Sequence, residues 1–150
     1  MKVAIIGCGS IAVSQHIPAY MNHPKVEIKY FCDIIPERAE AAVKQYGCGI
    51  AVTDYKRVLA DPQIDAVSVC TYNRQHAIPT IYALQKGINV MLEKPFTVTL
   101  DEAIEVMKAE KESGKILSIG FQPRLDANMK MIKKIVESGA LGEVYYIQTG

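Results

Sequence analysis

The sequence opens with MKVAIIGCGSIA (residues 1–12), in which an apolar run leads directly into a glycine-rich turn. Residues 3–6 are all apolar, which is typical of a strand buried on both faces. Gly7 permits a tight turn, Gly9 leaves room for a pyrophosphate against the backbone, and Ala12 lets the following helix pack close to the sheet. The pattern predicts a strand, a phosphate-binding turn and a helix.

An acidic residue stands about twenty residues after this turn, as dinucleotide sites require. Residues 26–32 are predicted to form a second strand, and Asp33 follows it. A carboxylate there can hold the ribose hydroxyls of NAD. It also repels the extra phosphate of NADP, and Ile34 and Ile35 bring no compensating positive charge. We therefore expect NAD as the cofactor, with NADP less favoured.

Glycines followed by an acid also occur in S-adenosylmethionine sites, which are the alternative interpretation of this motif. Those sites usually place an acid immediately before the glycines. Residues 3–6 offer only apolar side chains there, so the pattern favours the dinucleotide.

Composition narrows the class of protein. The chain has 150 residues, of which 49% are hydrophobic and 22% charged, and its net charge is +1. This balance argues against a nucleic-acid or membrane partner, and the N-terminal apolar run is too short for a signal peptide. The cysteines match no metal or disulfide spacing, so we expect free thiols, no metal and a cytoplasmic protein. They are Cys8, Cys32, Cys48 and Cys70.

Strand and helix patterns alternate along the chain. Strands are expected at residues 3–6, 26–32, 49–52, 64–70, 88–92 and 115–120, and helices at 10–21, 36–46, 54–61, 75–86, 99–114 and 126–138. Pro18 should bend the first helix or mark an irregularity in it. The alternation predicts an α/β doubly wound parallel sheet, the Rossmann fold, with six core strands in the order 3-2-1-4-5-6. Its ligand crevice should lie at the carboxyl ends of the first and fourth strands.

The end of the chain fits a different domain. We expect residues 1–122 to form the cofactor domain and residues 123–150 to form a linking helix and the first strand of a truncated substrate domain. That strand should begin within residues 144–149, where the sequence stops. The piece alone is therefore expected to be inactive.

Polar residues follow the fourth predicted strand, at the edge of the expected crevice. Thr71, Tyr72 and Asn73 stand there, and the amide of Asn73 either bonds the cofactor or caps the loop. His76 lies near the start of the next helix and is either a cofactor contact or a structural histidine.

Glu93 and Lys94 end the fifth strand, where α/β proteins collect reactive groups. Lys94 could polarise a substrate hydroxyl or join a proton relay; the alternative is a surface ion pair. Gln122 and Arg124 occupy the same position after the sixth strand. Arg124 either holds the substrate or contacts the missing domain.

These motifs together carry a family resemblance. They are Gly7-x-Gly9-x-x-Ala12, His16-x-Pro18-Ala19, Thr53-Asp54-Tyr55, Ile64-Asp65-Ala66-Val67, Asn73-x-x-His76, Gly87-x-x-Val90-x-x-Glu93-Lys94-Pro95 and Arg124. The chain resembles, over essentially its whole length, the cofactor domain of the glucose–fructose oxidoreductase / inositol dehydrogenase / MocA (Gfo/Idh/MocA) family. The resemblance implies that Glu93 and Lys94 lie beside the nicotinamide ribose and that Lys94 reaches the substrate. It also implies a second α/β domain with an open antiparallel sheet, which supplies the remaining catalytic groups.

The function expected from these features is hydride transfer between NAD and a hydroxyl of a sugar, cyclitol or related compound. The expected cofactor contacts are Gly7, Gly9, Ser10, Ile11, Ala12, Asp33, Ile34, Thr71, Tyr72, Asn73, His76, Glu93, Lys94 and Gln122. Lys94 is the expected catalytic residue, and Lys94 and Arg124 the substrate contacts. The full-length protein is expected to be a homo-oligomer. Two alternatives stay open: an NAD-dependent glycosidase of the same family, and a non-catalytic nucleotide-binding sensor.

Overall fold

A computed structural model of the protein describes residues 1–148. The chain divides into two compact units, residues 1–120 and residues 121–150. The first unit carries the sheet and most of the expected site residues. Within residues 1–148, no helix has both the length and the apolar character that crossing a membrane requires.

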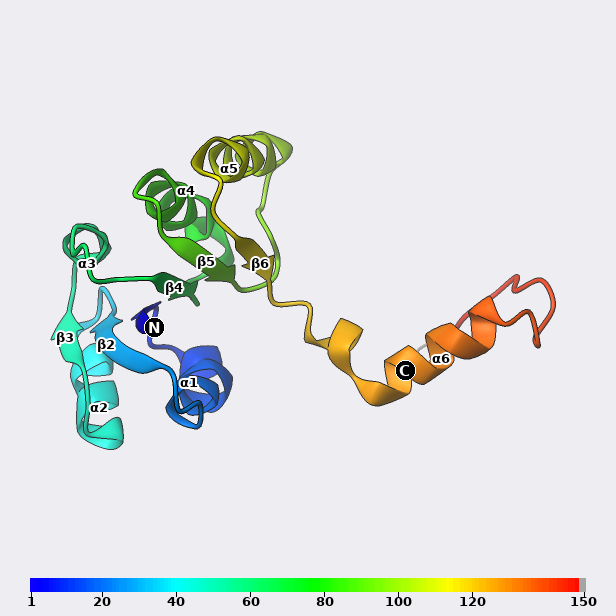
Figure 1. Cartoon of the computed structure of the whole chain (residues 1–150), viewed down its shortest axis with the longest axis horizontal. Coiled ribbons are helices and arrows are strands. Elements are labelled where there is room, and N and C mark those ends of the chain that lie inside the picture. The colour runs from blue at the N-terminus through cyan, green and yellow to red at the C-terminus, as the bar shows by residue number, and fades with distance from the viewer. Residues whose placement is uncertain (149–150) are drawn as a thin grey trace. The chain divides into compact units, whose positions relative to one another are not determined.

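The first unit is built on a six-stranded parallel sheet, shown in Figure 1. Its strands are β1 (Lys2–Ile6), β2 (Glu27–Cys32), β3 (Ile50–Val52), β4 (Ala66–Val69), β5 (Asn89–Leu92) and β6 (Leu117–Ile119). Their order is β3-β2-β1-β4-β5-β6, which confirms the expected Rossmann topology. In β1 the register sets Ile5 opposite Phe31 of β2 and Ser68 of β4. All strands run the same way, so the segments that follow them emerge at one edge.

Helices cover both faces of this sheet. They are α1 (Ile17–Met21), α2 (Pro36–Tyr46), α3 (Tyr55–Leu59), α4 (Ala77–Gln85) and α5 (Leu100–Ser113). Figure 1 shows α1 and α2 on one face and α3, α4 and α5 on the other. Each face has its own apolar core, one including Ile5, Ile17 and Phe31, and the other including Leu84 and Val106. Because the sheet is buried on both faces, its strands had to be apolar runs rather than alternating patterns.

The helix ends follow the local chemistry of the sequence. Thr99 and Glu102 form a capping box at the start of α5, in which each side chain accepts a hydrogen bond from the other residue's backbone N–H. Asp54 accepts the N–H of Lys56 at the start of α3. Gly47, in the left-handed conformation, ends α2.

The helix expected over residues 10–21 is interrupted. Ala12–His16 form a π-helical turn, in which the N–H of Ile17 donates to the carbonyl of Ala12, and α1 begins after it. Pro18 occupies the first turn of α1, where its missing N–H is tolerated. The predicted irregularity is therefore present, but it falls before the proline. His16, the last residue of this turn, is buried.

The second unit contains a 3-10 turn (Gln122–Leu125) and helix α6 (Ala127–Glu137). Asp126 caps α6 by accepting the N–H groups of Asn128 and Met129. The strand expected over 144–149 is wrong for residues 144–148, which form no strand. A strand needs a neighbouring strand to pair its backbone groups, and residues 121–148 contain no other strand. Thr149 lies outside the described residues.

Candidate cofactor site

The turn after β1 has the geometry that a phosphate-binding loop needs. Gly7 has a φ of +93°, and its N–H donates to the carbonyl of Cys32 at 2.7 Å. A Cβ built on Gly7 would lie 2.7 Å from the backbone carbonyl of Cys70, so no side chain fits. A Cβ on Gly9 would meet nothing within 4 Å, so the space beside that residue is open. The close packing of the turn against the backbone of Cys70 therefore requires glycine at position 7, whereas the absence of a side chain at Gly9 leaves open space beside the turn.

A helix begins directly at this turn. The N–H of Val13 donates to the carbonyl of Gly9 at 3.1 Å, which starts the helical hydrogen bonding there. The N–H groups of Ser10, Ile11 and Ala12 precede any helical acceptor, because the first turn has no carbonyl behind it. Such donors at the positive end of a helix suit an anion such as pyrophosphate.

Asp33 is fixed against the same turn. Its side chain is buried, with Oδ2 accepting the backbone N–H of Cys8 at 2.8 Å and Oδ1 accepting that of Ile35 at 2.9 Å. The carboxylate therefore lies at the carboxyl end of β2 in a fixed orientation, beside the turn that contains Gly7 and Gly9. Ile34, the next residue, is 84% exposed.

The thiol of Cys8 has no nucleophilic role in this turn. Burial, with a smaller effect from the carboxylate of Asp33, raises its pKa to about 12. Burial also raises the pKa of the Cys32 and Cys70 thiols to about 12. All three are thus protonated at neutral pH and act as small apolar groups.

The segment after β4 borders the same edge of the sheet. Tyr72 is 75% exposed and Asn73 begins a 3-10 turn (Asn73–Gln75), while the Thr71 hydroxyl donates to the carbonyl of Gln75 at 3.1 Å. Tyr72 and Asn73 are thus available to a ligand at the crevice. The Thr71 hydroxyl also holds the shape of its own loop.

His76 lies behind this loop with no exposed surface. Its Nδ1 is 2.7 Å from the carbonyl oxygen of Pro95, and its Nε2 is 3.0 Å from that of Thr71. The ring thus links the segment after β4 to the segment after β5. This geometry favours the structural interpretation of His76 over direct contact with a cofactor.

Glu93 and Lys94 follow β5 at the same edge. Glu93 is buried, whereas Lys94 is exposed. Glu93 Oε1 is 2.8 Å from Nε2 of His16, and the other ring nitrogen of His16 is 2.7 Å from the Ser68 hydroxyl. Neither His16 nor Ser68 was among the expected site residues. The signals were a histidine in the middle of the helix expected over residues 10–21 and a serine inside an apolar strand, and both need a polar partner when buried.

The structure thus brings the expected residues of the first unit to one edge of the sheet. Gln122 and Arg124 belong to the second unit, in its 3-10 turn, and both are exposed there. Among residues 1–148, no cluster of three or more histidine, cysteine or acidic side chains could hold a metal ion.

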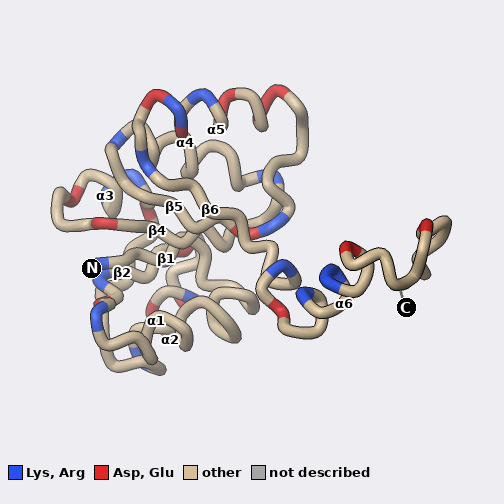
Figure 2. Tube along the Cα trace, turned by 45° about the vertical axis from the view of Figure 1, so that its right-hand side comes forward, with Lys and Arg blue, Asp and Glu red and all other residues tan. Residues whose placement is uncertain are grey.

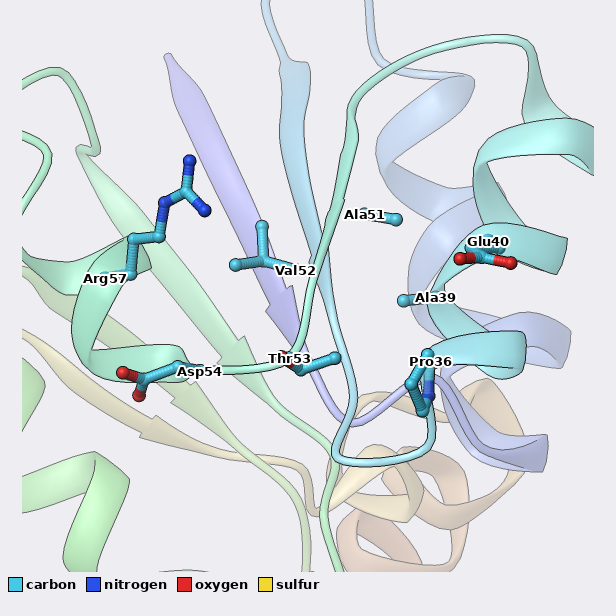
Figure 3. A pocket seen from close by; sticks show the side chains of 8 residues that line it. All are labelled: Pro36, Ala39, Glu40, Ala51, Val52, Thr53, Asp54 and Arg57. Atoms are coloured by element: carbon cyan, nitrogen blue, oxygen red, sulfur yellow. The ribbon is translucent and has the colours of Figure 1, made fainter.

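The pocket in Figure 3 is lined by none of these residues, although the N–H of Asp33 donates to the carbonyl of Val52, which lines it, at 3.1 Å. It has a volume of about 210 Å³ and borders the outer edge of β3, between α2 and α3. Arg57 of α3 and Glu40 of α2 flank it, and no residue of the glycine-rich turn lines it. Figure 2 shows both acidic and basic residues along α5.

Comparison with known proteins identifies the family of the chain. The family model of the Gfo/Idh/MocA oxidoreductases, described as an oxidoreductase family with an NAD-binding Rossmann fold, matches residues 1–121. D-Glucoside 3-dehydrogenase of Escherichia coli K12 is 34% identical over 145 residues, which are 97% of this chain and 41% of that protein. Inositol 2-dehydrogenase of Salmonella typhimurium is 33% identical over 146 residues, 95% of this chain and 43% of that protein. The chain thus spans less than half the length of these relatives.

Solved structures of other oxidoreductases have a similar fold. Myo-inositol 2-dehydrogenase from Lactobacillus plantarum matches with a TM-score of 0.89 and 30% identity, over 96% of this chain and 43% of that one. The WlbA dehydrogenase from Bordetella pertussis, in complex with NADH and UDP-GlcNAcA, matches with a TM-score of 0.89 and 29% identity, over 97% and 42% of the two chains. KijD10, a 3-ketoreductase from Actinomadura kijaniata in complex with NADP, matches with a TM-score of 0.87 and 27% identity, over 95% and 44%. Similar folds thus bind either cofactor.

Proposed function

Because the chain belongs to the Gfo/Idh/MocA oxidoreductase family and spans its NAD-binding Rossmann domain, we propose that the whole protein oxidises a hydroxyl of a sugar, cyclitol or related compound. One observation carries the cofactor half of this proposal. The Asp33 carboxylate is held 2.8 Å from the N–H of Cys8, within the turn whose next residue, Gly9, faces open space. A ribose acceptor and a pyrophosphate cradle therefore stand side by side.

The proposed cofactor contacts follow the strand ends. Gly7, Gly9, Ser10, Ile11 and Ala12 would hold the pyrophosphate; Asp33 and Ile34 the adenosine ribose and base; and Thr71, Tyr72, Asn73, Glu93, Lys94 and Gln122 the nicotinamide half. His76 acts on the cofactor through the two loops that it links. When bound, NAD supplies the acceptor for the hydride.

Lys94 provides the reactive group that this chain can contribute. Its side chain is exposed at the carboxyl end of β5, next to the buried Glu93. An ammonium group placed there stabilises the negative charge that develops on the substrate oxygen as its proton leaves. In this proposal Arg124 of the second unit helps to hold the substrate, and the remaining catalytic groups come from outside residues 1–150.

We expect the chain to prefer NAD over NADP by at least about tenfold in affinity, or about 1.4 kcal/mol. The reason is repulsion between the Asp33 carboxylate and the 2′-phosphate of NADP. Titration calorimetry with both cofactors at one ionic strength measures the ratio. Asp33→Asn should narrow it, whereas Glu37→Gln, an exposed change at the start of α2, should not. Equal or tighter binding of NADP by the unmodified chain contradicts the assignment.

We also expect the 150-residue chain to bind NAD without turning over substrate. Hydride transfer needs a cofactor, a held substrate and an acid–base pair. In this proposal residues 1–150 supply the cofactor site and, in Lys94, one part of the acid–base pair. The assay is NADH formation with a panel of polyols and sugars. Sustained turnover at an ordinary rate of about 1 s⁻¹ or more would show that the domain is catalytically complete.

The cellular setting of the whole protein is also part of the proposal. The four cysteines are free thiols, three of them buried, which fits a reducing compartment such as the cytoplasm. We propose a homo-oligomer for the full-length protein, with a small polyol or sugar as its substrate and no nucleic-acid partner.

A further inference from the structure

A buried polar cluster joins three elements of the first unit at the carboxyl end of the sheet. We call it the histidine bridge: Ser68 of β4, His16 of the π-helical turn, and Glu93 after β5. His16 contacts Ser68 Oγ through Nδ1 at 2.7 Å and Glu93 Oε1 through Nε2 at 2.8 Å. The three residues are 0%, 7% and 3% exposed.

The local backbone explains how a polar side chain reaches this position. Across the turn Ala12–His16 the helix gains a residue, since the N–H of Ile17 donates to the carbonyl of Ala12. Ser14 and Gln15 of this turn are exposed, but His16 is buried against the sheet. A π-helical turn changes the direction of the side chains that follow it, and such turns are frequent at functional sites.

A serine, a histidine and an acid in line also occur in nucleophilic enzymes, but this cluster does not fit that use. Ser68 has no exposed surface, so no substrate can reach its hydroxyl. The Tyr20 hydroxyl donates to the same oxygen at 3.4 Å, which encloses it further. The cluster therefore acts through geometry rather than by attacking a substrate.

Stability alone is a weak reason for such a cluster. Replacing a buried ionic pair by apolar side chains of similar volume is often neutral or stabilising. The cluster instead gives the Glu93 carboxylate a fixed orientation from one side. The same carboxylate is 3.2 Å from the backbone N–H of Lys94, through its other oxygen. The bridge thus reaches from the π-helical turn and β4 to the backbone of the exposed lysine.

The half of the sheet that contains β4 and β5 is the side on which the nicotinamide is expected. Asp33 follows β2 and takes the adenosine ribose, and a dinucleotide crosses the sheet from one half to the other at the β1–β4 switch point. β5 lies beyond β4, on the far side from β2. Glu93 and Lys94 therefore stand where the nicotinamide half of the cofactor extends.

We propose that His16 is a positioning residue: by holding Glu93, it sets the Glu93–Lys94 segment that receives the nicotinamide half of the cofactor. This proposal rests on the NAD-binding function above. It predicts a selective defect, because the adenosine half is held by Asp33 and the glycine turn. Removing the bridge should weaken NADH binding but not the binding of ADP-ribose, which lacks the nicotinamide.

The experiment compares the two ligands on the 150-residue chain, using the fluorescence of NADH and calorimetry for ADP-ribose. The variants are His16→Leu, which removes both contacts, and His16→Gln, whose amide N–H can still donate to Glu93. His23→Leu is the control, because His23 is exposed. We expect His16→Leu to weaken NADH about tenfold and ADP-ribose less than twofold, with His16→Gln recovering most of the loss. The control should match the unmodified chain.

Several outcomes would overturn the proposal. Equal losses for both ligands in His16→Leu, without recovery in His16→Gln, mean that the histidine only holds the fold together. Unchanged NADH binding in His16→Leu means that it positions nothing. If His16→Leu does not fold, Ser68→Ala takes its place, with an expected threefold selective loss of NADH, and an unchanged affinity there counts against the bridge. An unmodified chain that binds neither ligand refutes the NAD site itself, and this proposal with it.

Discussion

Gly9→Val is expected to abolish NAD binding in a chain that still folds. The open space beside Gly9, where a Cβ meets no atom within 4 Å, is the space proposed for the pyrophosphate. A valine side chain would fill it, so we expect a loss of affinity of at least about 100-fold, or about 2.7 kcal/mol. No neighbour has to move, so the free energy of unfolding should change by less than about 1 kcal/mol.

Calorimetry with NAD and urea unfolding followed by circular dichroism provide the two measurements. Ala19→Val is the matched control, because Ala19 is exposed on α1, away from the turn, and receives the same side chain. It should bind NAD normally. A folded Gly9→Val variant with normal affinity would place the phosphate cradle elsewhere.

Gly7→Ala is expected to have the opposite profile, with the fold itself damaged. The new Cβ would lie 2.7 Å from the carbonyl carbon and oxygen of Cys70 and 2.8 Å from the N of Thr71. These are backbone atoms of the β4 end and cannot rotate away. The φ of +93° adds backbone strain for any residue with a side chain. Collision and strain together should lower the free energy of unfolding by roughly 2–5 kcal/mol.

Gly114→Ala separates the two causes. Gly114 has a φ of +63°, but a Cβ there would meet nothing within 4 Å. Its replacement should therefore show strain alone, roughly 1–2 kcal/mol. Equal losses in the two variants would mean that the contact with Cys70 relaxes and that close packing does not explain Gly7.

The topology could be predicted from sequence because each element carried its own local signal. The apolar run of β1 leads into the glycine turn, Thr99 and Glu102 cap α5, and Gly47 ends α2. Alternation of such elements leaves few possible sheet orders. The residues at the crevice edge followed from the same rule, since parallel strands end together. Asp33 needed only its distance from the glycines to be identified.

What could not be predicted depends on contacts between distant segments. The link from His16 to Glu93 joins residues 77 positions apart, and Ser68 looks like any small residue in a strand. The role of His76 was ambiguous from the sequence, because it depends on two carbonyl oxygens from different loops that lie on either side of its ring. The strand expected from residue 144 failed for a related reason, because a strand depends on a partner that these residues do not have here.

The linked loops have a consequence for anyone who tries to alter substrate choice by exchanging segments between relatives. His76 bonds the carbonyl of Thr71 on one side and that of Pro95 on the other. A graft that replaces only the segment after β4 brings in a loop from a protein with a different segment after β5. The two carbonyl oxygens would then no longer both lie where the imidazole ring can contact them. The smallest exchangeable unit is therefore discontinuous: the loop at 71–76 together with the turn at 93–95.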